Sequence, residues 1–124
     1  MKRGGVNHWK DLVVWRKSHE LVLLVYKVVG TFAKNEQYDL ADQIKRAAAS
    51  VPANIVEGHS RNSQKDFLRF LYIARGSLEE LRYFLLLSRD LKYVVEIKYN
   101  ELENTCTQTS KLLNGLIKSL KPTT

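Results

Sequence analysis

The stretch SQKDFLRFLYIARGSLEELRYFLLLSRDL, residues 63–91, decides the fold of this chain. Its apolar positions alternate strictly between spacings of four and three residues: Phe67, Leu71, Ala74, Leu78, Leu81 and Leu85. Residues with this spacing lie on one face of an α-helix, whereas a strand would need a period of two. A mean spacing close to 3.5 also favours helices that pack at shallow crossing angles. The stretch therefore predicts a long helix within a bundle.

Three other segments carry the same pattern, so the rest of the chain is also predicted to be helical. The predicted helices cover residues 12–33, 39–57, 63–91 and 95–120. Gly58 is expected to end the second of them in a left-handed conformation. Short connections between such helices join neighbours that run in opposite directions. The sequence predicts an all-α fold, an antiparallel up-and-down four-helix bundle, as a single domain over residues 1–124. We expect residues 1–10 to form a flexible basic arm and residues 121–124 a frayed tail, because Pro122 cannot continue a helix.

Length and composition limit the class of protein. A chain of 124 residues with 44% hydrophobic and 27% charged residues suits one globular domain with its own core. The first ten residues hold no apolar run of signal-peptide length, and the longest apolar run, residues 21–26, is too short to span a bilayer. Cys106 is the one cysteine and cannot form an internal disulfide. These features predict a cytoplasmic protein with no membrane partner.

Patterns typical of catalysis or metal binding are weak. Glu57 and His59 lie two residues apart, whereas the di-iron pattern of helix bundles needs three. Leu23 stands where a zinc protease would have a histidine four residues after His19. Cys106 falls on the apolar stripe of the fourth predicted helix, so we expect it in the core and not as a nucleophile. The sequence thus predicts no enzyme activity, no catalytic residue, no metal site and no cofactor.

A basic stripe runs along the third predicted helix. The chain has a net charge of +7, and residues 61–95 hold seven Lys and Arg against four Asp and Glu. At about 100° per residue, these cations fall on neighbouring faces of one helix. Basic side chains neutralise phosphates and release counterions, and a tyrosine among them can stack on an unpaired base. The predicted nucleic-acid-binding residues are Arg61, Lys65, Arg69, Tyr72, Arg75, Arg82 and Arg89, assisted by Lys2 and Arg3 of the arm.

Other features leave two further interpretations of this face open. Glu79 lies in the middle of the stripe, and arginines often cover a solvated helix face. Leu68 and Leu86 on the same face are typical of a surface that another subunit covers. More apolar residues lie outside the main stripes of the first and third predicted helices: Val13, Val14, Leu23, Leu24, Phe70, Ile73, Phe84 and Leu87. Because a single bundle cannot cover both faces of a helix, the sequence predicts self-assembly.

Polar residues line one face of the second predicted helix, around Pro52. A proline inside a helix leaves the carbonyl of Ala48 without its backbone donor and costs roughly 3 kcal/mol. Ser50 or Asn54 can satisfy that carbonyl, directly or through water, and Asn54 and Glu57 can meet polar residues of the next helix. The predicted structural polar network comprises Arg46, Ser50, Asn54, Glu57, Ser77 and Glu80.

Three runs of sequence also resemble a known family. SVPANIVEG at residues 50–58 occurs with DLVVWRK upstream at residues 11–17 and with SLEEL downstream at residues 77–81. Together they resemble the proteins encoded by 23S rRNA intervening sequences, a family related to the accessory variability protein of diversity-generating retroelements. The resemblance covers about residues 9–120. It departs at residues 34–36, where the family often has a proline before the tyrosine that opens the second helix.

The resemblance implies a function as well as a fold. It implies a four-helix bundle that forms a homo-oligomer, a pentameric ring with a basic surface. It also implies a non-catalytic binding or scaffold protein whose expected partner is RNA or another nucleic acid. The alternative is a protein-binding adaptor, analogous to the retroelement accessory protein that works with a reverse transcriptase, with no direct role in nucleic-acid binding.

Overall fold

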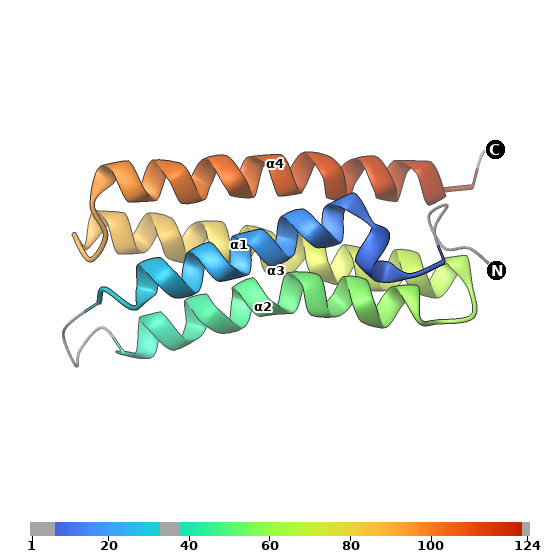
Figure 1. Cartoon of the computed structure of the whole chain (residues 1–124), viewed down its shortest axis with the longest axis horizontal. Coiled ribbons are helices and arrows are strands. Elements are labelled where there is room, and N and C mark those ends of the chain that lie inside the picture. The colour runs from blue at the N-terminus through green and yellow to red at the C-terminus, as the bar shows by residue number, and fades with distance from the viewer. Residues whose placement is uncertain (1–6, 33–37, 123–124) are drawn as a thin grey trace.

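The computed structural model describes residues 7–32 and 38–122 of the chain. Four long helices dominate this part: α1 (Val13–Val29), α2 (Tyr38–His59), α3 (Gln64–Asp90) and α4 (Glu96–Leu120), preceded by a short 3-10 helix, η1 (Trp9–Asp11). Figure 1 shows the four lying lengthwise together, with successive helices running in opposite directions. Each helix contacts the next in the chain, and α1 contacts α4, so the four enclose one core. The predicted all-α, antiparallel up-and-down four-helix bundle is confirmed.

In α2 and α3 the core follows the predicted apolar stripes, whereas in α1 the buried face is turned toward Val14, Leu21 and Val25. The α3 stripe is buried along its whole length, from Phe67 at 0% exposure to Leu85 at 1%. Each fully buried leucine or phenylalanine contributes about 1.5–3 kcal/mol relative to an exposed one, so this stripe supplies much of the driving force for folding. Val14 was expected outside the core but is only 4% exposed and belongs to it. Among the described residues, no helix is both long and apolar enough to cross a membrane.

The ends of the helices fix how α2 and α3 meet. Ser63 caps α3, because its Oγ accepts a hydrogen bond from the Asp66 backbone N–H at 3.1 Å. Gly58 was expected to end α2 in a left-handed conformation, and this is wrong, since α2 continues to His59. The glycine is needed for packing instead. A Cβ added at Gly58 would lie 2.7 Å from the Cβ of Phe70, so the two helices approach too closely there for any side chain.

The N-terminal segment packs on α1 through aromatic rings. Residues 1–10 were predicted to be a flexible arm, and this is wrong for residues 9 and 10, which form η1 together with Asp11. The rings of Trp9 and Trp15 lie 4.8 Å apart edge to face, and the Trp15 ring stacks on His19 at 5.1 Å. Such pairs add about 0.5–1.5 kcal/mol to the burial of the rings, so η1 is held against α1. Lys2 and Arg3 lie outside the described residues.

Candidate nucleic-acid interface

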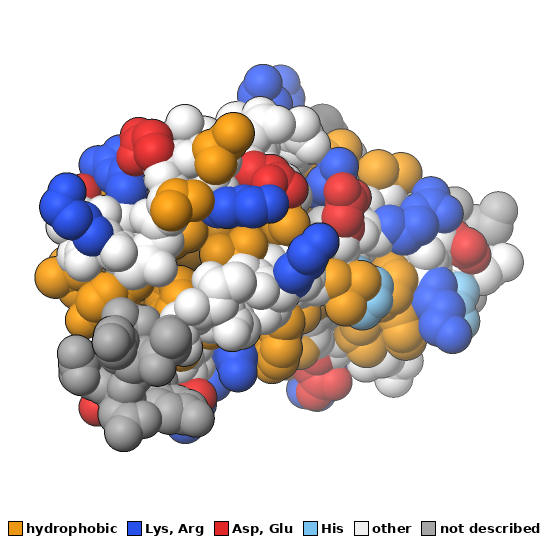
Figure 2. Space-filling model, turned by 60° about the vertical axis from the view of Figure 1, so that its left-hand side comes forward, with side chains coloured by type: hydrophobic (Ala, Val, Ile, Leu, Met, Phe, Trp, Pro, Cys, Tyr) orange, Lys and Arg blue, Asp and Glu red, His pale blue; other side chains and the backbone are white. Residues whose placement is uncertain are grey.

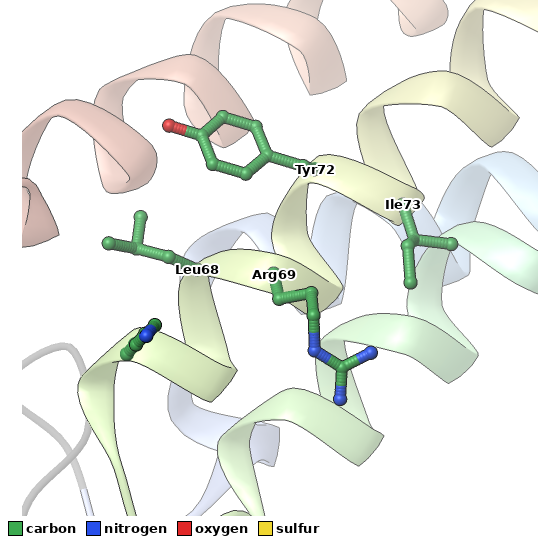
Figure 3. Close-up of a pocket in the computed structure, with 5 residues that line it drawn as sticks. Leu68, Arg69, Tyr72 and Ile73 are labelled. Atoms are coloured by element: carbon green, nitrogen blue, oxygen red, sulfur yellow. The ribbon is translucent and has the colours of Figure 1, made fainter.

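The first half of α3 carries a basic surface with an aromatic and aliphatic floor. A shallow hollow of about 510 Å³ is lined by Lys65, Leu68, Arg69, Tyr72 and Ile73. Figure 3 shows Leu68 and Tyr72 leaving the helix toward one side, while Arg69 and Ile73 leave it toward another. The helical spacing of these residues produces this arrangement, since positions 68 and 72 are one turn apart, as are 69 and 73. The predicted residues Lys65, Arg69 and Tyr72 therefore share one hollow.

Two cations flank the ring of Tyr72. The guanidinium carbon of Arg75 lies 4.9 Å from the ring centroid, and the Nζ of Lys121 lies 5.9 Å from it. Arg75 also donates a hydrogen bond to Asn114 Oδ1 on α4 at 3.1 Å. From the sequence, Lys121 was expected only in a frayed tail. The predicted topology could have indicated this contact, because an antiparallel bundle brings the end of α4 beside the beginning of α3.

Arg61 and Arg69 both lie over the ring of Phe70. Their guanidinium carbons are 4.9 and 4.5 Å from the ring centroid, which places two positive charges close to this half-buried ring. Arg61 also forms an ion pair with Glu57 at 2.9 Å, and Arg69 lies 4.0 Å from Asp66. All four charged side chains are exposed to solvent, so these two pairs contribute little to stability.

The second half of the predicted stripe is neutralised within the chain. Arg82 donates to Glu103 Oε1 on α4 at 2.6 Å and to Glu79 Oε1 at 3.1 Å. The hydrogen bond with Glu103 is the main reason why the pKa of Arg82 is raised. Arg89 forms an ion pair with Asp90 at 3.1 Å and covers the ring of Tyr99 at 4.8 Å. The structure thus groups five of the seven predicted residues near Phe70 and Tyr72 and places Arg82 and Arg89 in separate ion pairs.

Three of the six residues predicted for the polar network meet between α2 and α3. The hydroxyls of Ser50 and Ser77 lie 2.8 Å apart, and the Asn54 amide donates to Ser50 Oγ at 3.0 Å. The same amide donates to the Ser50 carbonyl at 2.8 Å, so Asn54, one of the two predicted partners of the Ala48 carbonyl, is directed at Ser50 instead. These contacts tie α2 to α3 just before Pro52.

The other members of the predicted network lie elsewhere. Arg46 and Glu80 are exposed on their helices, and Glu57 turns to Arg61. Their distance from the serine pair follows from the geometry of α2, whose polar face is wider than the strip that touches α3. The central trio is half-buried and lies in the contact between α2 and α3.

Cys106 lies in the core of the bundle, as the sequence predicts. It is 0% exposed on α4, and burial is the largest of the causes that raise the pKa of its thiol to about 12. A thiol in that state holds its proton at neutral pH, as is typical of a core cysteine. In residues 7–32 and 38–122, no three or more His, Cys, Asp or Glu side chains are placed so that they could hold a metal ion.

Comparisons with known proteins agree with this architecture. Residues 10–115 match the family described as 23S rRNA-intervening sequence protein. A crystal structure of a protein with unknown function from the S23 ribosomal protein family of Bacteroides thetaiotaomicron VPI-5482 is similar, with a TM-score of 0.80 and 30% sequence identity. The match covers 86% of this chain and 99% of that one. A search of curated proteins found no match. With the family matched over residues 10–115 and the bundle fold in place, the chain belongs to the 23S rRNA-intervening sequence protein family.

Proposed function

We propose that this chain is a non-catalytic cytoplasmic binding protein that holds nucleic acid by its phosphates along the first half of α3. One observation carries the proposal: several cations gather there around an apolar hollow, and only some of them lie beside a carboxylate. In the described part of the chain, no ion pair with a carboxylate involves Lys65, Arg75 or Lys121. The net charge of +7 adds a long-range attraction for polyanions.

The chemistry of the surface suits phosphate better than a small ligand. The hollow is open and holds flexible cationic side chains, which neutralise phosphates without fixing one substrate geometry. Binding of this kind releases condensed counterions, so the logarithm of affinity falls linearly with the logarithm of salt concentration. It also shows little sequence preference, because phosphates carry no sequence information.

A salt series with matched variants tests the proposal. Binding of a fluorescent RNA and of a fluorescent DNA duplex would be measured by anisotropy for wild type and for Lys65→Gln with Arg75→Gln. Each lost phosphate contact lowers the slope of log affinity against log salt by about 0.7 for single strands or about 0.9 for duplex DNA. Lys27→Gln with Lys98→Gln removes the same charge at the opposite end of the bundle. If both double variants behave alike, the first half of α3 is a solvated face.

We further propose that the protein self-assembles, and that its oligomer is the pentamer implied by the family resemblance. Exposed apolar side chains support the assembly: Leu23 is 59% exposed, Val95 64% and Ile97 75%. Figure 2 brings forward the end of the bundle at which α1 ends and α4 begins. It shows hydrophobic side chains at the surface between charged ones. Clusters of this kind usually mark protein interfaces.

The same exposed residues favour one alternative function, a protein-binding adaptor with no direct role in nucleic-acid binding. The molecular mass in solution distinguishes self-assembly through this surface from the binding of another protein. If wild type is an oligomer and Ile97→Asp is a folded monomer, the cluster is an interface between copies. If wild type is a monomer at micromolar concentration, the self-assembly proposal fails, and co-purification of one protein partner at high salt would then support the adaptor.

A further inference from the structure

The hollow on the first half of α3 continues toward the end of α4. A second hollow of about 730 Å³ is lined by Gln64, Lys65, Leu68, Ser119, Leu120, Lys121 and Pro122. Lys65 and Leu68 line both this hollow and the one that holds Tyr72. The two therefore form one groove, which runs from Ile73 on α3 to Pro122 beyond α4. We call it the α3–α4 groove.

The far end of this groove is built on a fixed backbone. The Gln64 side-chain amide donates to the Leu120 carbonyl at 3.1 Å, which joins the first turn of α3 to the last turn of α4. The backbone N–H of Lys121 donates to the Ile117 carbonyl at 3.2 Å, so the residue that carries the third cation is still attached to the helix end. Lys121 is thus held within reach of Tyr72 by contacts that a freely moving tail would lack.

Cations and apolar groups lie together in the groove. Lys65, Arg69 and Lys121 line it, and Arg75 lies beside the ring of Tyr72. Leu68, Ile73 and the Tyr72 ring supply an apolar floor. Tyr72 is 38% exposed and Ile73 is 43% exposed, so this floor is open to solvent. A ligand that matches the groove must offer negative charge and flat apolar surface together, within a few ångströms of each other.

Duplex and single-stranded nucleic acid differ in that respect. In a duplex the faces of the bases are stacked on one another, and the outward surface is phosphate and sugar, which gain nothing from an apolar floor. In a single strand each base has a free face, which can stack on a tyrosine while its neighbouring phosphates meet cations. The cations beside Tyr72 are the ends of long, flexible side chains, so they can swing from the ring to phosphates when a base arrives.

We propose that the α3–α4 groove binds single-stranded nucleic acid in preference to duplex, with one unpaired base stacked on Tyr72. Lys65, Arg75 and Lys121 hold the phosphates on either side of that base. The inference rests on the proposed function, which assigns phosphate binding to this surface, and it adds the class of nucleic acid and the new residue Lys121.

The test compares one sequence in two forms. A labelled single strand of about 12 nucleotides, within the range that single-stranded sites cover, would be titrated as RNA and as DNA, alongside the same sequence closed into a duplex. The proteins are the full chain and its variants Tyr72→Leu, Tyr83→Leu and Lys121→Gln. Tyr83 is an exposed tyrosine of the same helix, 58% exposed, that lines neither hollow, so it controls for the loss of an aromatic ring.

We expect the single strand to bind more tightly than the duplex. Tyr72→Leu should weaken single-strand binding by about 5- to 150-fold, the effect of losing one stacked base, and leave duplex binding unchanged. Tyr83→Leu should change neither. Lys121→Gln should lower the salt slope for the single strand by about 0.7. Equal losses with RNA and DNA would show that the 2′-hydroxyl is not read.

Two results would overturn the inference in distinguishable ways. If duplex and single strand bind equally and Tyr72→Leu has no effect, the surface is a phosphate-binding face without base stacking, and the proposed function survives alone. If neither form binds at low salt, the proposed function fails, and the inference fails with it. Circular dichroism and thermal melting of each variant would show that a loss of binding is not a loss of fold.

Discussion

Residues 64–76 and 77–90 are the two halves of one straight helix, and both carry arginines on the same side, yet the two halves meet different partners. In the first half, Arg75 meets the neutral Asn114 and the ring of Tyr72. In the second half, Arg82 meets two carboxylates, Glu79 and Glu103. A charge pattern along a helix therefore does not show which of its charges are available to a ligand, because the neighbouring helix decides that.

The antiparallel course of α4 explains the difference. Its first half, with Glu103, runs beside the second half of α3, and its end, with Asn114 and Lys121, runs beside the first half. Arg82 and Glu103 are each 29% exposed, so their ion pair is partly shielded from solvent and joins the two helices. In the second half of α3, Arg82 thus helps to hold α3 against α4, whereas in the first half no ion pair with a described carboxylate involves Lys65 or Arg75.

The largest expected effect concerns the thiol that lies near the Arg82–Glu103 pair. Because the pKa of Cys106 is raised from 9.0 to about 12, its alkylation by iodoacetamide at pH 8 should be ~1,000-fold slower than that of the same chain unfolded in urea. Rapid alkylation of the folded protein would show that this half of the bundle opens. Rates would be followed by mass spectrometry.

The same thiol should make stability depend on pH. The folded pKa lies above the unfolded one, so between pH 9 and 12 the folded chain keeps a proton that the unfolded chain has lost. Stability gained from this group is present below pH 9 and declines as pH rises through that window. Wild type should therefore lose stability relative to Cys106→Ala above pH 9, measured by urea unfolding. A constant difference between the two proteins would contradict the raised pKa.

The next effect tests how the first half of α3 is anchored. Gly58→Ala places a Cβ 2.7 Å from the Cβ of Phe70 and 3.0 Å from a ring carbon of Phe67, so it should lower the free energy of unfolding by about 3 kcal/mol. Gly76→Ala is the matched control, since a Cβ there meets nothing within 4 Å. It should raise stability by about 0.5–1 kcal/mol, because alanine favours a helix interior over glycine. Similar losses in both variants would contradict the close approach at Gly58.

Nucleic-acid binding should separate the two halves directly. Lys65→Gln with Arg75→Gln removes two contacts, which at 0.1 M salt corresponds to about 25-fold weaker binding of a single strand. Arg82→Gln with Arg89→Gln removes the same charge from the second half and should weaken binding less than about 2-fold, because those cations are already neutralised. Equal losses, measured by anisotropy, would mean that the whole stripe binds as first predicted from the sequence.

The smallest expected effect is on stability, where a substitution in the second half of α3 should cost more than one in the first half. Arg82→Gln leaves the partly shielded Glu103 without its ion-pair partner and should lower the free energy of unfolding by about 1 kcal/mol. Lys65→Gln should stay within about 0.5 kcal/mol of wild type, because Lys65 is exposed. A double-mutant cycle with Glu103→Gln would isolate the pair, and a coupling energy near zero would show that it does not hold α3 to α4.

The architecture was predictable because it depends on periodicity, which is a local property. The alternation from Phe67 to Leu85 gives the buried face of α3 whatever the neighbouring helices are, and Ser63 marks the beginning of that helix through its own hydroxyl. Gly58 was misinterpreted for the opposite reason. Its small size serves a contact with Phe70 on another helix, which no pattern within α2 reveals.

The sequence by itself determined four helices, their order, the buried stripes of α2 and α3 and a basic face on α3, because each of these follows from spacing along a single helix. Only the tertiary structure decided which cations are free. That choice depends on α4, whose Glu103 neutralises Arg82 and whose last residues bring Lys121 to Tyr72. These side chains are far apart in the chain, and the packing register that joins them is set by the shapes of two whole helices.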